Sequence, residues 1–142
     1  MATTYAANAT NAFNTNPPVK GGPETGGARV RELRDVITFA SQASGDTIVV
    51  GGKKLPIGAT VLYGFINTDT STATATLAVG ISGSTAKYKA AGAVTTTNAP
   101  QLFGVVAGAI ATTTEEQIIV TVGTAALPSS GTAQIHLFYT VD

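Results

Sequence analysis

Few residues of this chain can move protons or activate a nucleophile. Among its 142 residues there are one histidine and no cysteine, and proton transfer near neutral pH uses histidine most often. His136 is therefore the candidate base, but its place between Ile135 and Leu137 in an alternating apolar stretch favours a structural or interface role. The segment Gly80–Ser84 resembles a nucleophile elbow but misses the Gly-x-Ser-x-Gly spacing. We therefore expect that the protein is not an enzyme.

The acidic and glycine-rich segments predict no cofactor or metal site. Glu115 and Glu116 are adjacent, so in a strand they point to opposite faces and cannot flank one substrate bond. We expect both to keep a loop and the start of a strand in contact with water. A lone histidine with scattered carboxylates such as Asp69 matches neither zinc-ligand nor calcium-loop spacing. Gly51–Lys54 fails as a phosphate-binding loop, because Thr47 stands where its first glycine is required, and we interpret it as a turn with two exposed lysines.

Charge and composition point to a neutral surface. Only 11% of the residues are charged, about half the usual share, and eight basic residues balance eight acidic ones. Phosphate binding needs clustered cations, so we expect no nucleic-acid partner. The start of the chain has no signal-peptide pattern and no later stretch reaches the ~18 apolar residues of a membrane span, so we expect no membrane association.

A weakly charged surface favours self-association, because net charge is what keeps monomers apart. We therefore expect a homo-oligomer. Stretches of small side chains would give flat faces suited to subunit contacts, although they could equally be tolerant loops. These stretches are Thr72–Ala78, Ala90–Ala99 and Ala107–Thr114.

Residues 1–28 differ from the rest of the chain. They are rich in Ala, Thr and Asn and are interrupted by Pro17-Pro18 and by glycine pairs, which excludes one continuous strand or helix. Two interpretations stay open, a disordered terminus or an extended N-terminal arm that orders on a neighbouring subunit. Tyr5, Phe13 and Val19 are spaced apolar anchors that favour the arm, so we predict partner binding by these three residues together with Pro17 and Pro18. The β domain is expected to span residues 29–142.

The remainder consists of short apolar runs separated by turn residues, which is typical of strands. The expected strands are Arg29–Ala40, Thr47–Val50, Ala59–Asn67, Thr74–Ser82, Ala86–Ala90, Leu102–Ile110, Gln117–Gly123 and Thr132–Val141. Helical periodicity is weak, and in Arg29–Phe39, the one ambiguous segment, the β-branched residues favour a strand. Eight antiparallel strands predict an all-β sandwich or jelly-roll-like body, with a closed barrel as the alternative.

Two of these segments alternate clearly between apolar and polar positions. In Thr74–Ser82 the alternation predicts a half-buried strand, with Leu77 and Val79 on the apolar side. In Thr132–Val141 the outward set includes Phe138, so we expect this outer face to be covered.

Several motifs resemble small virion structural proteins of tailed bacteriophages. They are Asp46-Thr47-Ile48, Lys54–Leu62, Leu77–Gly80, the basic strand Arg29-Val30-Arg31 and the Thr/Asn-rich opening. The turn Leu55–Ala59 carries the "leucine-proline-x-glycine-alanine" pattern, in which Pro56 fixes φ and Gly58 permits a positive φ. The resemblance extends from Met1 to about Tyr88.

The resemblance implies a capsid decoration or cement protein that binds and stabilises the outside of a phage head. It implies the major capsid protein as partner, a trimer as the favoured oligomer, location on the virion surface after synthesis in the host cytoplasm, and no catalytic residues. The alternative is a tail- or fibre-associated β-sandwich that binds a carbohydrate or a receptor. Against it, sugar sites usually stack the ligand on exposed aromatic rings, and the chain has no tryptophan.

Overall fold

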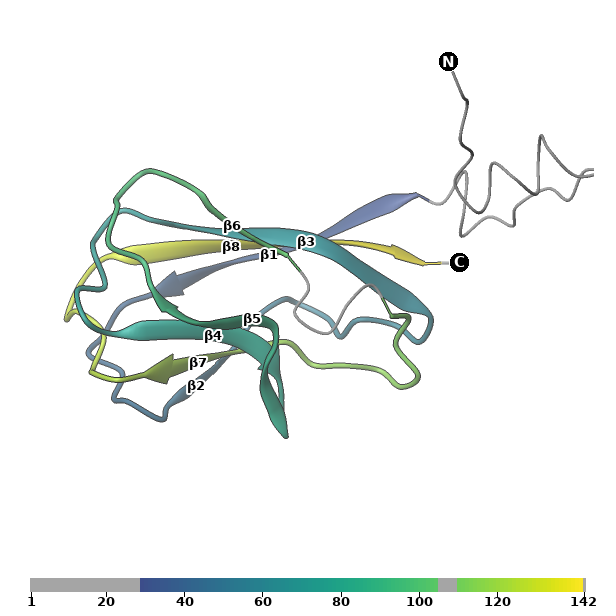
Figure 1. Cartoon of the computed structure of the whole chain (residues 1–142), viewed down its shortest axis with the longest axis horizontal. Coiled ribbons are helices and arrows are strands. Elements are labelled where there is room, and N and C mark those ends of the chain that lie inside the picture. Colours follow the sequence, from purple (N-terminus) through teal and green to yellow (C-terminus); the bar gives the residue numbers. More distant parts are fainter. Residues whose placement is uncertain (1–28, 105–109, 142) are drawn as a thin grey trace, which may run out of the picture. The chain divides into compact units, whose positions relative to one another are not determined.

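The computed structural model describes residues 29–104 and 110–141, and β-strand is the only extended regular structure in these two ranges. Figure 1 shows the strands in two layers. The strands are β1 (Val30–Thr38), β2 (Thr47–Val49), β3 (Ala59–Thr68), β4 (Thr76–Ile81), β5 (Ser84–Ala93), β6 (Gln101–Gly104), β7 (Ile119–Gly123) and β8 (Thr132–Val141).

Each expected strand overlaps one observed strand, and the ambiguous segment Arg29–Phe39 is confirmed as a strand. Seven of the eight strands differ from the prediction at one or both ends, and two of these differences have a clear physical description. β5 begins at Ser84 because the hairpin turn is tight, with Gly83 at a φ of 83° and Ile81 paired to Ser84. β6 ends at Gly104, so the longer expected strand Leu102–Ile110 is wrong at its described end, where Ile110 is not in a strand.

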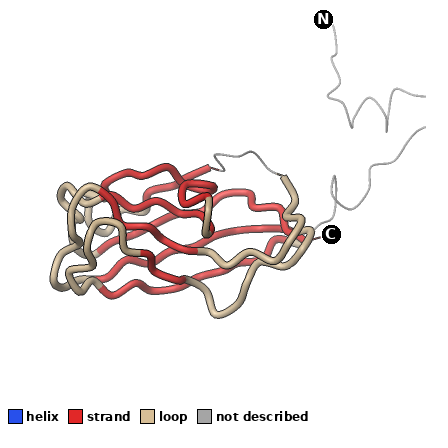
Figure 2. Tube along the Cα trace, turned by 90° about the horizontal axis from the view of Figure 1, so that it is seen from below, coloured by secondary structure: helices blue, strands red, loops and turns tan. Residues whose placement is uncertain are grey.

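The pairing pattern follows from winding up one long hairpin. Antiparallel pairs join β1 to β8, β2 to β7, β3 to β6 and β4 to β5, so the hairpin tip lies between β4 and β5. Rolling this hairpin adds the pairs β3–β8 and β4–β7 and gives two four-stranded sheets, ordered β1-β8-β3-β6 and β2-β7-β4-β5. This is a jelly roll, which confirms the predicted sandwich. In Figure 2 the strands run along the body and the loops gather at its ends.

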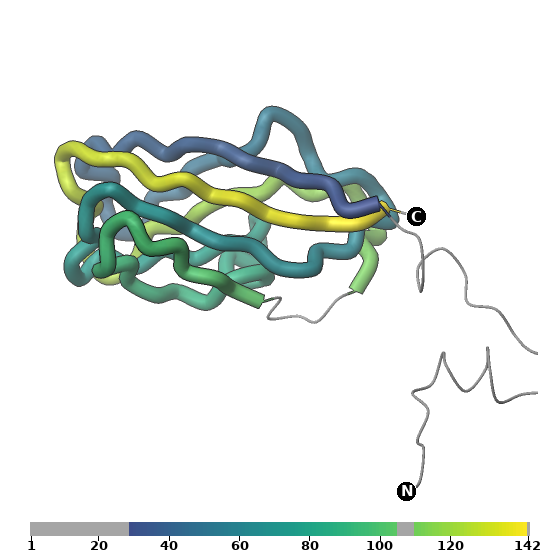
Figure 3. The backbone as a smooth tube through the Cα atoms, turned by 90° about the horizontal axis from the view of Figure 1, so that it is seen from above, coloured from purple at the N-terminus to yellow at the C-terminus, as the bar shows by residue number. Residues whose placement is uncertain are grey.

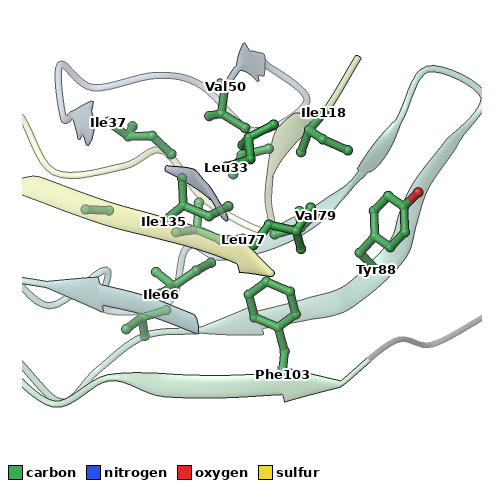
Figure 4. Packing of buried hydrophobic residues seen from close by; sticks show 14 of the residues in the cluster. Leu33, Ile37, Val50, Ile66, Leu77, Val79, Tyr88, Phe103, Ile118 and Ile135 are labelled. Carbon is green, nitrogen blue, oxygen red and sulfur yellow. The ribbon is translucent and has the colours of Figure 1, made fainter. Parts of the chain in front are cut away.

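The core lies between the two sheets and is made of the inward side chains of both (Figure 4). On β4, Leu77 and Val79 are 0% exposed, as the alternation predicts. The half-buried expectation is nevertheless wrong, because Ala78 and Gly80 on the other side of β4 are also buried. A Cβ at Gly80 would lie 2.2 Å from the carbonyl oxygen of Ser84, so the start of β5 covers this side of β4.

The turn that enters β3 has the predicted conformation. Gly58 has a φ of 81°, and the amide of Ala59 donates to the carbonyl of Pro56 at 3.2 Å. A second bond, from the same amide to Thr112 Oγ1 at 3.0 Å, ties the turn to the chain before β7. Both lysines of the Gly51–Lys54 turn are exposed, as predicted.

Candidate functional site

The sheet β1-β8-β3-β6 presents one face to the core and one away from it. Figure 3 shows these four strands side by side, with β1 purple, β8 yellow, β3 teal and β6 green. Register places the outward side chains in two cross-strand rows, with partners directly opposite one another. Row one is Glu32, Phe138, Tyr63 and Gly104, and row two is Arg34, His136, Phe65 and Leu102. We call the surface formed by these rows and their flanking residues the outer face.

Four rings form a continuous stack at the centre of the outer face. The ring centroids of Tyr63 and Phe138 are 4.8 Å apart with an interplanar angle of 26°. Those of Phe65 and His136 are 4.3 Å apart at 15°, and Phe65 lies 6.2 Å from Phe138 across the two rows. Such aromatic pairs add about 0.5–1.5 kcal/mol to the burial of their area, so the four rings stabilise one another as one aromatic platform.

Apolar side chains in and around this platform stay open to solvent. Tyr63 is 44% exposed, Leu102 75%, and Val30 and Val36 57% each. A folded domain rarely leaves large apolar side chains together on one face unless that face binds something. The outer face is therefore the candidate interaction surface.

His136 belongs to this surface and is held there from two sides. Its Nδ1 forms a hydrogen bond with Glu32 Oε1, and its ring lies on Phe65. Within residues 29–104 and 110–141, no hydroxyl group hydrogen-bonds to the imidazole. The contacts of His136 thus fit the predicted structural or interface role, with the ring fixed between a carboxylate and an aromatic side chain.

A second polar cluster lies between β5 and the segment before β7. The carboxylate of Glu116 accepts hydrogen bonds from Lys87 Nζ and from the hydroxyl of Tyr88. The prediction that Glu116 keeps this segment in contact with water is wrong, because Glu116 is only 7% exposed. Its carboxylate tolerates burial because a cation and a phenol satisfy both oxygens. Burial raises the pKa of Tyr88, and the hydrogen bond to Glu116 and its negative charge raise it further.

Lys89 is a further buried charge that sequence analysis did not single out. The pairing of β4 with β5 shifts between Leu77 and Val79, opposite Lys89. The ammonium group of Lys89 fills this irregularity by donating to the carbonyls of Leu77 at 2.9 Å and Ala90 at 3.1 Å. Burial lowers the pKa of Lys89. The cluster and this lysine are structural features of the sheet edge.

The residues predicted to bind a partner, Tyr5, Phe13, Pro17, Pro18 and Val19, lie outside the described residues. Among the small-residue stretches, Thr72–Ala78 is not a contact face, because Thr72, Ala75 and Ala78 are buried in the sandwich. The described part of the chain holds no group of three or more His, Cys, Asp or Glu side chains placed to bind a metal ion. Nor does it contain a helix with the length and hydropathy of a membrane span.

Scans of protein families and of curated proteins find no match to this chain. Solved structures with a similar fold do exist. A chain of the cyanophage Pam1 capsid asymmetric unit matches with a TM-score of 0.67 and 22% identity, over 92% of this chain and 99% of that chain. A chain of the capsid of Ralstonia phage GP4 matches with a TM-score of 0.63 and 22% identity, over 80% of this chain and 85% of that chain.

A third match comes from the acid-stable capsid of Helicobacter pylori bacteriophage KHP30. It has a TM-score of 0.57 and 12% identity, over 79% of this chain and 87% of that chain. All three structures are phage capsids. At these identities the matches show a shared fold, and they cover 85–99% of each matched chain.

Proposed function

We propose that this chain is a non-enzymatic structural protein of a phage virion, and more specifically a decoration or cement protein that binds and stabilises the outer surface of the head. One observation carries the proposal. The jelly roll matches chains of three phage capsids over 79–92% of this chain and 85–99% of each matched chain, so in those capsids this fold makes up most of one chain.

The geometry of the molecule supports a role in assembly. An aromatic platform faces away from the core, with exposed apolar side chains around it. The proposed partner is the major capsid protein, and the proposed location is the virion surface. A trimer rests on the resemblance alone, and the small share of charged residues supports self-association in general.

Co-sedimentation tests this function directly. Purified phage heads that lack this protein are mixed with the full-length chain and pelleted, and bound chain is measured in the pellet. We expect saturable binding with many copies per particle. A chain that stays in the supernatant at micromolar concentration contradicts the decoration role. Genomic neighbours give an independent check, because a gene beside a major capsid gene fits a head role and a gene in a metabolic operon fits no virion role.

Residues 1–28 are proposed as an assembly arm. Tyr5, Phe13 and Val19 would each bury apolar area on a partner at about 25 cal/mol per Å², while ordering costs roughly 1–2 kcal/mol per residue. Only a subset of the arm should therefore carry affinity, helped by the locally stiff Pro17-Pro18. Deletion of residues 1–27 should leave the β signal in circular dichroism and weaken co-sedimentation. Equal binding by both forms would make the segment an ordinary tail.

The alternative role in carbohydrate or receptor binding gains one observation. The ring of Tyr63 is 44% exposed beside Phe138, and sugars stack on exposed rings of this kind. A glycan array separates the two roles. A reproducible hit that is lost in Tyr63→Ala would favour the fibre or receptor function, whereas the decoration role predicts no hit.

A further inference from the structure

The two rows of the outer face are complementary to each other, position by position. Glu32 in row one corresponds to Arg34 in row two on β1, and Phe138 corresponds to His136 on β8. Tyr63 corresponds to Phe65 on β3 and Gly104 to Leu102 on β6. An acid thus corresponds to a base, each ring to a ring, and an absent side chain to a large exposed one.

This pattern has a direct geometric consequence. A two-fold axis that runs across the strands, midway between the rows, lays row one of one molecule on row two of a second molecule. Two-fold contacts are self-complementary, so each contact occurs twice. Glu32 then faces the second copy's arginine at position 34, and both aromatic stacks lie on each other.

The two positions on β6 add a steric match to the charge match. A Cβ placed on Gly104 would find nothing within 4 Å, while Leu102, two residues earlier, is 75% exposed. In the two-fold arrangement the leucine of each copy projects over the glycine of the other. The face therefore has a knob and an open position at matching places.

We propose that the outer face is the contact surface of a two-fold dimer of this chain, in which row one of each copy packs on row two of the other. The occupant of the face is a second copy because the charges, rings and β6 residues are complementary to themselves. The inference does not depend on the virion role, since it concerns association of the purified chain in solution.

The area sets the expected strength. Four strands ~4.8 Å apart, and the two rows with one flanking row on either side at ~6.8 Å spacing, give a face of roughly 500 Å² in plan. A standard stable interface buries about 800 Å² on each partner. We therefore expect a weak dimer that forms at high micromolar to millimolar concentration and is reinforced when copies are held close together.

A pair of charge variants tests the pairing. Glu32→Arg places an arginine in both rows of β1, and Arg34→Glu places a glutamate in both. Each variant alone should lose self-association by about tenfold or more in analytical ultracentrifugation, because like charges face each other. An equimolar mixture should regain association at least as strong as wild type, since both contacts are again between opposite charges.

The matched control moves the same charges elsewhere. Lys53→Glu and Glu115→Arg alter exposed residues outside this sheet, and alone or mixed they should sediment like wild type. Gly104→Leu should fold normally and weaken association, because it fills the place of the partner's leucine.

Several outcomes would overturn the proposal. The first is a wild-type chain that stays monomeric at millimolar concentration. The second is a charge variant that, measured by itself, sediments like wild type. The third is an equimolar mixture of the two charge variants that associates no more strongly than either variant by itself. If the control mixture gains as much association as the charge-variant mixture, the attraction comes from net charge, and the proposed pairing is refuted. If deletion of residues 1–27 abolishes association while the charge variants have no effect, the dimer contact would lie in the arm and not in the outer face.

Discussion

Gly64 is a position where the core and the outer face constrain each other. It lies on β3 between Tyr63 and Phe65, and a side chain at this position would point toward the core. A Cβ there would lie 2.4 Å from Cζ of Phe103 and 2.6 Å from the backbone oxygen of His136. The ring of Phe103 could turn aside, but the oxygen of His136 belongs to the neighbouring central strand and can move only if β3 and β8 separate.

We therefore expect Gly64→Ala to destabilise the fold. Overpacking of this kind costs about 1–3 kcal/mol, and alanine recovers roughly 0.5–1 kcal/mol relative to glycine in a strand. The net loss is about 1–2 kcal/mol, which lowers the melting temperature of a domain of this size by roughly 4–8 °C. Differential scanning calorimetry measures it.

Gly52→Ala is the matched control, because Gly52 is exposed, does not have a positive φ, and a Cβ there meets nothing within 4 Å. Its melting temperature should stay within the equivalent of about 0.5 kcal/mol of wild type. If Gly64→Ala melts at or above the wild-type temperature, the close packing between β3, β6 and β8 is refuted.

Three further predictions concern pH, each followed by urea unfolding. Hydrogen bonds from the backbone and side chain of Thr132, and from Thr70, lower the pKa of Asp69. The contribution of Asp69 to the stability of the fold is therefore present above pH 3.8 and is lost as pH falls through the lower folded-state pKa. Asp69→Asn should therefore be less stable than wild type at pH 6, and the gap should close in acid. The raised pKa of Tyr88 gives stability that is present below pH 10 and lost above it. Tyr88→Phe should be less stable than wild type at pH 7 by about 1–3 kcal/mol, because a buried carboxylate loses a donor. Between pH 7 and pH 11 it should lose less stability than wild type does. Parallel curves of stability against pH for the two proteins would contradict this. Burial lowers the pKa of Lys89 below its ordinary 10.5, so the unfolded state binds more protons between the two values and stability rises with pH there. Relative to Lys89→Met, wild type should gain stability from pH 8 to 10, and a constant difference would rule out the burial effect.

Local patterns in the sequence predict much of this fold. Alternating apolar residues mark β8 from Thr132 to Val141 with the observed bounds, and Pro56 with Gly58 predicts the turn before β3. The same alternation places Phe138 outward, which identifies one residue of the outer face. These features depend on neighbours within a few positions, so one segment suffices to predict them.

The contacts between distant segments could not be predicted in this way. Glu32 reaches His136 across 104 positions, and the buried Glu116 finds its partners on β5, 28 and 29 positions away. Glu116 looks like a surface residue until that pairing is known. The register that aligns the two rows is likewise a property of the assembled sheet, because a shift of one residue would turn His136 and Phe138 toward the core.

If the proposed virion role is right, the outer face should be buried when the protein is bound to the particle. Hydroxyl-radical footprinting of intact virions, compared with the free chain, measures this most directly. We expect strong protection of Tyr63 and Leu102 on the particle, with less change at Val49 and Ile57, which are exposed elsewhere. Full reactivity of Tyr63 and Leu102 on the particle, with Val49 or Ile57 protected, would contradict it.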